Sequence, residues 1–338
     1  MSTVSLPAAR TTPVRSSATV GWAWWLTRRL GAGLLVVWGV TVFIFVSTQL
    51  LPNDPAHAIL GIQATQESID ALTRQLGLDR PAYEQYAAWL GGLLHGDFGI
   101  SLGTKQPVTA VIGYRFFNSV VLMLIAAVIA IPLAVFLGVV TAVRRDRRMD
   151  RTVLSAGMVL TSLPDFVIAL ALVVLFATTV TRLLPAVSAF PAGDWPTWYP
   201  NELVLPVATM VLVSVPYLYR LFRASMIDVL ESEYVQMARL KGIPERVIIV
   251  KHALPNALVP GIQATGLLLS GMLAGIVIVE YVFRYPGLGT ALTQAINIRD
   301  LPVIQAIVLI YALAVVLFNL LADIATILAT PKLRTARS

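Results

Sequence analysis

Long stretches without charged side chains dominate the hydrophobic pattern of this chain. About 20 residues of α-helix cross the hydrocarbon core of a membrane, which is about 30 Å thick. Six stretches come close to that length or exceed it, at residues 31–51, 118–143, 152–181, 203–219, 253–279 and 301–322. None alternates apolar and polar residues with the period of two that a membrane β-barrel requires. The pattern therefore predicts an all-α, polytopic membrane protein with about six spans.

Asp165 is the only acidic residue inside these stretches, and it lies near the middle of the third. A carboxylate inside a membrane is costly and usually faces a cavity or a partner. Two roles stay open: Asp165 lines the path of a substrate, or it makes a structural contact in a turn broken by Pro164.

Other polar residues lie closer to the ends of the stretches or inside the sixth. We expect Glu280 and Asp323 at the membrane interface, because both are near span ends. Gln305 and Asn319 are expected to form hydrogen bonds between helices.

Composition supports a membrane protein and excludes several kinds of chemistry. Apolar residues make up 57% of the 338 residues, charged residues 13%, and the mean hydropathy is +0.78. Soluble domains average about 45–50% apolar and about 25% charged residues. The chain has no cysteine, which excludes disulfides, Cys-ligated metals and a thiol nucleophile. The three histidines lack metal-ligand spacing, so we expect no metal site.

Lys and Arg are unevenly divided between the two sides of the expected bundle. The two termini and the connections on their side carry 18 of these residues, and the other side carries seven. Cytoplasmic segments of membrane proteins carry the excess of Lys and Arg. Both termini are therefore predicted to be cytoplasmic. The net charge of +7 follows from this asymmetry and does not indicate nucleic-acid binding.

The expected domain organisation has three parts. Residues 1–25 are a disordered cytoplasmic tail with an interfacial segment, residues 26–330 form the transmembrane domain, and residues 331–338 are a cytoplasmic tail. In the interfacial segment, tryptophans beside Arg28 suit a helix at the level of the lipid headgroups, from which the chain would turn into the first span.

The outer segment 52–116 is too polar to cross a membrane. It is expected to hold one helix at about 66–76, capped by Gly77, and a second that starts at Pro81 and ends at Gly96. This segment could be a cap packed on the membrane helices or a docking surface for an external partner.

The cytoplasmic loop 223–258 differs from the other connections. Apolar residues at helical spacing predict one helix with a single exposed apolar stripe. The stripe consists of Met226, Leu230, Tyr234, Met237 and Ala238.

Gly242 is expected to end that helix in the left-handed conformation. Pro244 would open a second short helix, Pro255 would end it, and Asn256 would cap the next span. An exposed apolar stripe next to a membrane requires a partner groove. The alternatives are a loop packed on its own helix ends and a DNA-reading helix-turn-helix, which the short tethers to two spans disfavour.

The loop resembles the EAA motif of binding-protein-dependent ABC importer permeases. The matching residues are Glu233-Tyr-Val-Gln-Met-Ala238-Arg-Leu-Lys-Gly242, followed by Leu254-Pro255. In that family the loop forms coupling helices that bind in a groove on a cytoplasmic ATPase subunit. The resemblance implies that contact for Glu233, Tyr234, Met237, Ala238, Arg239, Lys241, Gly242, Leu254 and Pro255. Tyr234 and His252 depart from the motif's usual alanine-like and isoleucine positions.

Further motifs resemble the dipeptide and oligopeptide branch of the family, in its B-type permeases. They extend over roughly residues 26–334, although Thr330 stands where Asp is usual. They are Leu51-Pro-Asn-Asp-Pro55, Leu76-Gly-Leu-Asp-Arg-Pro81, Trp89 to Gly99, Tyr285-Pro-Gly-Leu-Gly289, Arg299-Asp-x-Pro302, Asn319-x-x-x-Asp323 and Pro331-Lys-Leu-Arg334.

The resemblance also implies an assembly in the cell membrane. A homologous second permease completes the pore, two ATPase subunits bind ATP and magnesium, and an external binding protein delivers a peptide. This chain has no G-x-x-x-x-G-K-[ST] loop for a nucleotide, so it is expected to be a transport subunit without a cofactor or an enzymatic activity of its own. A nickel or glutathione importer of the same family is one alternative, and a secondary transporter without an ATPase is another.

Overall fold

The computed structural model describes residues 18–49, 65–75, 79–178 and 181–329. Helices dominate these residues, and the one β-bridge among them joins Ile100 to Pro107. The predicted all-α class is confirmed.

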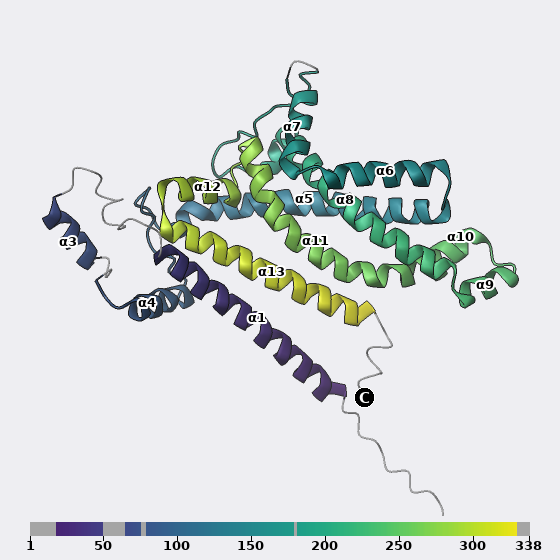
Figure 1. Cartoon of the computed structure of the whole chain (residues 1–338), viewed down its shortest axis with the longest axis horizontal. Coiled ribbons are helices and arrows are strands. Elements are labelled where there is room, and N and C mark those ends of the chain that lie inside the picture. Colours follow the sequence, from purple (N-terminus) through teal and green to yellow (C-terminus); the bar gives the residue numbers. More distant parts are fainter. Residues whose placement is uncertain (1–17, 50–64, 76–78, 179–180, 330–338) are drawn as a thin grey trace, which may run out of the picture.

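Five of the helices are long and apolar enough to cross a membrane. They are α1 (Ala18–Gln49), α5 (Val108–Val143), α8 (Pro200–Leu230), α11 (Leu254–Phe283) and α13 (Leu301–Ala329). Helix α8 packs along α5 and α11, α11 packs on α13, and α1 lies along α13 at the edge of the bundle (Figure 1). The predicted number of about six spans is reached if one bent pair of helices is counted as a span.

That bent pair replaces the single span expected over residues 152–181. Helices α6 (Arg148–Ser162) and α7 (Asp165–Phe176) meet at an angle of 107°. Leu163, which precedes a proline, is extended with ψ 134°, as the clash with the proline ring requires. Asp165 consequently lies in the first turn of α7 instead of the middle of a straight helix.

Several helices extend beyond their charge-free stretches. Helix α5 starts at Val108, ten residues before the predicted stretch, and α8 continues past Tyr219 to Leu230. Helix α1 is continuous from Ala18, so the expected turn between the tryptophans and the first span is absent within the described part of the chain. A charge-free stretch is shorter than its helix because a helix that leaves the membrane can carry charges at its ends.

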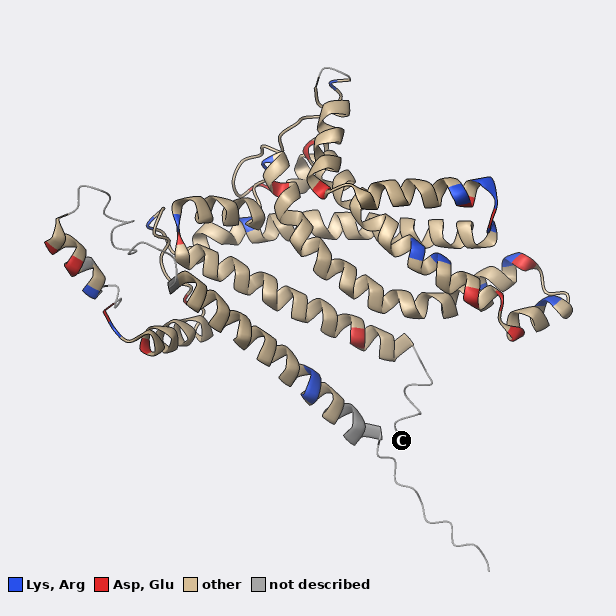
Figure 2. Cartoon of the chain, viewed as in Figure 1, with Lys and Arg blue, Asp and Glu red and all other residues tan. Residues whose placement is uncertain are grey.

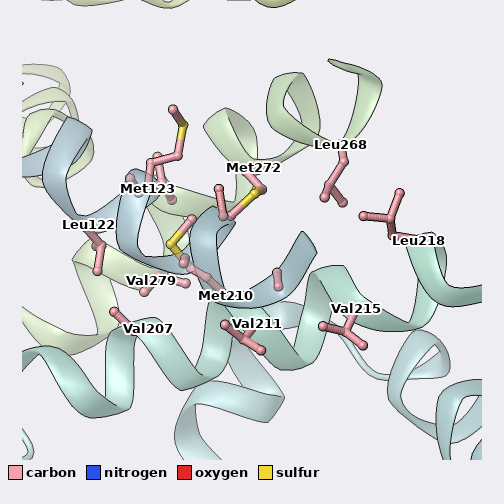
Figure 3. Packing of buried hydrophobic residues seen from close by; sticks show 14 of the residues in the cluster. Leu122, Met123, Val207, Met210, Val211, Val215, Leu218, Leu268, Met272 and Val279 are labelled. Carbon is pink, nitrogen blue, oxygen red and sulfur yellow. The ribbon is translucent and has the colours of Figure 1, made fainter. Parts of the chain in front are cut away.

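The core lies between α5, α8 and α11 (Figure 3). Leu122 and Met123 of α5 pack with Met210 of α8 and with Leu268 and Met272 of α11. Small residues allow the helix backbones to approach, as is common between membrane helices. A methyl group added at Gly138 would lie 2.7 Å from Phe222, and one added at Gly157 would lie 2.9 Å from the Tyr219 ring.

Most of the charged residues lie toward the ends of the bundle (Figure 2). We call one end the basic end. It holds the turn between α5 and α6, the loop 231–253 and the C-terminal end of α13. Within it, Arg223 of α8 forms a two-pronged ion pair with the buried Asp150 of α6, with N–O distances of 2.7 and 2.6 Å.

The opposite end carries α3 (Gln66–Gln75), α4 (Ala82–Leu94) and α12 (Leu288–Ile298). Helices α3 and α4 confirm the two helices expected in the outer segment. Gly96, with φ 81°, follows the end of α4, whereas Gly77 lies outside the described residues. The Tyr86 hydroxyl contacts Thr41 Oγ1 at 2.8 Å, so α4 packs on α1 as the cap interpretation requires.

Candidate functional site

The loop that resembles the EAA motif lies at the basic end, but its apolar residues do not lie on one helix. Helix α8 ends at Leu230, and α9 (Glu233–Leu240) begins after a short turn. Met226 is fully buried on α8. The predicted single stripe from Met226 to Ala238 is therefore wrong, because the helix breaks at Glu231 and Ser232.

Helix α9 has one buried face and one exposed face. Val235 and Ala238 are buried against Ile248, with exposures of 0%, 8% and 0%. Tyr234, Met237 and Leu240 are 46%, 53% and 82% exposed. The resemblance implies a partner contact for Ala238, and in the structure its side chain packs α9 onto the loop.

We call the set Tyr234, Met237 and Leu240 the α9 apolar face. Leu240 is its most exposed member and was not among the residues predicted to contact a partner. These three residues recur every three positions, so a helix predicted to start at Glu233 instead of Met226 would have placed them on one face.

Gly242 ends α9 in the left-handed conformation that its position predicted, with φ 73°. The Gly242 N–H donates to the Arg239 carbonyl oxygen at 2.9 Å, and the Ile243 N–H donates to that of Ala238 at 3.2 Å. This pair of bonds is a Schellman motif, which satisfies carbonyl groups at the end of a helix. Ile243 then packs on the cluster of Val235, Ala238 and Ile248.

The second helix of the loop starts as expected but does not end as expected. Pro244 precedes α10 (Glu245–Val247), and a π-helical turn, η2 (Ile248–Ala253), leads directly into α11. Pro255 therefore lies in the first turn of α11 and ends no helix. Proline fits there because the first turn of a helix leaves its N–H groups unpaired anyway.

Asn256 is not the cap of the next span. Its Nδ2 donates to the Tyr234 hydroxyl at 3.1 Å and to the His252 carbonyl oxygen at 2.8 Å. These bonds tie the exposed ring of Tyr234 to the start of α11. The side chain of Leu254 beside it is half-buried.

Arg239 connects the parts of the loop. Its guanidinium donates to Glu245 Oε1 at 2.8 Å and to the Leu230 carbonyl oxygen at 3.2 Å. The hydrogen bond to Glu245 raises the pKa of Arg239 above its ordinary value. Glu233 and Lys241 are exposed at the two ends of α9. The resemblance thus groups residues of two kinds, those that build the loop and those that face outward.

Asp165 lines a cavity of about 570 Å³ together with residues of α8, α11 and α13. A methyl group added at Gly275 of α11 would lie 3.1 Å from Asp165 Oδ2, so this glycine leaves room for the carboxylate. Among the described residues, Asp165 has no hydrogen-bond or ion-pair partner. The structure thus places this side chain at the wall of the cavity.

Glu280, which was expected at the membrane interface, lies three residues before the end of α11 and is fully buried within the protein, with 0% exposure. Its carboxylate accepts hydrogen bonds from Ser119 Oγ at 2.5 Å, from the Gly289 N–H at 2.6 Å and from the Thr290 N–H at 3.3 Å. A methyl group at Gly287 would overlap this carboxylate. The glycines after Tyr285 thus leave space for a buried acid at the N-terminus of α12.

Gln305 and Asn319 connect helices as expected. Gln305 Nε2 donates to Thr48 Oγ1 of α1 at 3.1 Å, and Asn319 Nδ2 donates to Ser270 Oγ at 3.2 Å. Asp323 forms an ion pair with Arg29 of α1.

Asp300, in the motif Arg299-Asp-x-Pro302, has a structural role at the opposite end. It is buried and accepts hydrogen bonds from Ser101 Oγ, from the Leu102 N–H at 3.0 Å and from the Gly103 N–H at 3.2 Å. Asp300 thereby holds the loop before α5 against the turn between α12 and α13.

Two family models together match residues 23–335 of the chain. The family described as binding-protein-dependent transport system inner membrane component matches residues 134–335, and the N-terminal part of such a component matches residues 23–138. A Brucella abortus strain 2308 protein, provisionally named a peptide transport system permease protein, is 36% identical over 309 residues, covering 91% of this chain and 98% of that protein. The glutathione transport system permease protein GsiC of Escherichia coli K12 is 34% identical over 295 residues, covering 87% and 94%.

Proposed function

The chain belongs to the family of binding-protein-dependent transport system inner membrane components, and from that premise we propose that it is the permease subunit of an ATP-driven importer of peptides. It is a multi-pass membrane protein with helices that form a bundle around an apolar core. The transported substrate would pass along this bundle, and the energy would come from ATPase subunits on the basic end.

The α9 apolar face is the observation that carries this proposal. Three large side chains are exposed on the outer face of a helix whose inner face is packed, and the Schellman turn at Gly242 and the bond from Asn256 to the Tyr234 hydroxyl hold that helix in place. Exposed apolar groups on a short, rigid helix are suited to a groove on another protein. Glu233 and Lys241 at the two ends of α9 would lie at the rim of that groove.

The same loop is attached to the substrate path. Helix α8 runs from α9 to Met210 and Ser214, and α11 runs from η2 to Gly271 and Gly275, so both helices reach the cavity of Asp165. A displacement of the loop by closing ATPase subunits would therefore move two walls of this cavity. A second, homologous permease would supply the facing walls, and an external binding protein would deliver the substrate at the opposite end.

Peptides are the substrate class that the relatives support. The Brucella abortus relative is named for a peptide system. Glutathione, itself a small peptide, is a second candidate because the Escherichia coli relative is named for its transport. Both substrates fit a permease without covalent chemistry.

Transport by reconstituted vesicles tests the proposal. The chain is purified with the subunits that remain bound to it and is placed in vesicles together with the external binding protein and internal ATP. Uptake of labelled dipeptides, longer peptides, glutathione and nickel is then compared. We expect peptide uptake that stops without ATP. Uptake by this chain alone, without an ATPase, would support a secondary transporter and refute the proposal.

A further inference from the structure

Two cavities follow one another along α7 and α11, and they carry opposite charges. The inner cavity, of about 570 Å³, contains Asp165 and lies near the middle of α8 and α11. The outer cavity, of about 850 Å³, contains Arg115 and Arg284 and lies toward the opposite end. Phe166 on α7 lines the outer cavity next to Asp165 in the inner one, so the two cavities are neighbours along the same pair of helices.

The inner cavity presents a carboxylate to an otherwise mostly apolar space. Its other polar groups come from uncharged residues, such as Ser214 and Ser270. The half-buried Asp165 carboxylate has no hydrogen-bond or ion-pair partner of its own among the described residues. A cationic group of a ligand would supply that missing partner.

The outer cavity presents guanidinium groups. Arg115 Nη1 donates to Gln294 Oε1 at 3.2 Å, and its Nε donates to the Tyr114 hydroxyl at 2.9 Å. Arg284 is exposed and held in the left-handed conformation at the end of α11, with φ 50°. Guanidinium groups bind carboxylates through paired N–H donors. Neither arginine forms an ion pair in the part of the chain that the structure describes, although Arg115 interacts electrostatically with the buried Glu280.

The spacing of these charges suits a peptide. Gly275, beside Asp165, and Arg284 are nine residues apart on α11, which corresponds to about 14 Å along a helix. An extended peptide covers about 3.3–3.6 Å per residue. The length of the arginine side chains reduces the distance that the peptide has to span. A peptide with free termini carries one ammonium and one carboxylate at its ends.

We propose that the two cavities are successive subsites for a zwitterionic peptide, with its ammonium bound by Asp165 and its carboxylate bound near Arg115 and Arg284. This inference rests on the proposed function and adds the chemistry by which the permease itself recognises its substrate. It assigns a positioning role to each charge along the path and no covalent step.

The test compares chemically blocked peptides in the reconstituted transporter with its binding protein and ATPase subunits. One short peptide is used with free ends, with an acetylated N-terminus and with an amidated C-terminus. For the wild type, we expect each block to slow uptake. Asp165→Asn should slow uptake of the free peptide about tenfold and abolish the effect of acetylation, while amidation still matters. Arg284→Asn should show the converse pattern, and asparagine tolerates the left-handed conformation.

Matched controls separate the charge from the fold. Arg299→Asn replaces an arginine in the same left-handed position at the end of α12, with φ 57°, and Asp194→Asn removes a carboxylate that the Tyr199 hydroxyl binds outside both cavities. Both controls should keep the wild-type response to each block. The external binding protein is identical throughout, so its own preferences cancel in the comparison with the wild type.

If Asp165→Asn is poorly folded, a second variant and the wild type still test the inference. Gly275→Ala keeps the charge but crowds the carboxylate, and it should weaken the discrimination against acetylated peptide. Equal uptake of free and acetylated peptide by the wild type, or an unchanged ratio in Asp165→Asn, would overturn the inference alone. Absence of any peptide uptake by the wild type would instead contradict the proposed function.

Discussion

The turns that follow α9 and α11 share one backbone design and differ in what lies beneath them. Both are Schellman motifs: Ile243 N–H donates to the Ala238 carbonyl oxygen at 3.2 Å, and Tyr285 N–H donates to that of Glu280 at 2.9 Å. The left-handed residue is Gly242 in the first turn and Arg284 in the second. The difference between the turns therefore comes from their surroundings.

The turn after α9 is a surface feature. A methyl group added at Gly242 would meet no atom within 4 Å, and the ion pair of Arg239 and Glu245 beside it is half-exposed. The turn after α11 is a closed structure, in which Tyr285 and the carboxylate of Glu280 are completely buried. A change in the first turn should therefore alter recognition more than folding, whereas a change to the buried groups of the second should mainly lower stability.

The largest effect is expected for Glu280→Ala. This change leaves the N–H groups of Gly289 and Thr290 and the hydroxyl of Ser119 without their acceptor in a buried site. Each unsatisfied group costs about 1–3 kcal/mol, so we expect a loss of at least about 3 kcal/mol in the free energy of unfolding. The measurement is thermal unfolding of the purified protein in detergent. The control, Glu245→Ala at the exposed turn, should hardly change the unfolding temperature, and equal shifts would contradict the comparison.

A smaller loss of stability is expected for Gly287→Ala. The added methyl group would overlap the Glu280 carboxylate, and such overpacking typically costs about 1–3 kcal/mol. Gly113→Ala on α5 is a matched control, because a methyl group there has no neighbour within 4 Å. Both variants are compared by yield and unfolding temperature. An unaffected Gly287→Ala would mean that the fit around Glu280 is not tight.

At the basic end, Gly242→Val should affect coupling more than abundance. A branched residue at φ 73° is strained, at a cost of about 1–3 kcal/mol, and relief of that strain would turn the α9 apolar face. We expect nearly normal membrane insertion with reduced recovery of the ATPase subunits and reduced peptide uptake. Gly242→Asn should be milder, since asparagine adopts the left-handed conformation. If Gly242→Val showed wild-type recovery of the ATPase subunits and wild-type peptide uptake, the loop would only connect α8 to α11.

The two faces of α9 should respond differently to a charge. Leu240→Asp adds a charge at an 82% exposed position, so the unfolding temperature should change little. Loss of an apolar anchor at an interface costs about 2 kcal/mol, so association with the ATPase subunits should weaken about thirtyfold. Val235→Asp, on the buried face, should instead lower the yield of folded protein. Unchanged recovery of the ATPase subunits with Leu240→Asp would exclude the α9 apolar face as their binding site.

The sequence predicted features that depend on local chemistry. The absence of charges located the spans, and the glycine at position 242 located a left-handed helix end. The break of the third span was also foreshadowed by Pro164, although its angle of 107° was not. Each of these features is determined by a few neighbouring residues and needs no knowledge of the packing.

Features that depend on distant partners could not be predicted in the same way. Glu280 accepts a hydrogen bond from Ser119, which is 161 residues away in the sequence, and Asp300 holds a loop about 200 residues away. Nothing near Glu280 in the sequence indicates that its carboxylate is buried inside the protein. The division of α9 into two faces was missed for a related reason, because the helix register depends on the break at Glu231 and Ser232.

The smallest effect is expected for Glu233→Ala. Glu233 is exposed in the first turn of α9, and no described residue pairs with it, so its removal should not change the unfolding temperature. An exposed charge at the rim of an interface is worth about 1 kcal/mol or less, which corresponds to at most about a fivefold loss in association with the ATPase subunits. Salt screens such charges, so the difference from the wild type should disappear as ionic strength rises. Pull-down at low and high salt, beside Leu240→Asp, tests this. A larger effect that persists at high salt would place Glu233 inside the interface instead of at its rim.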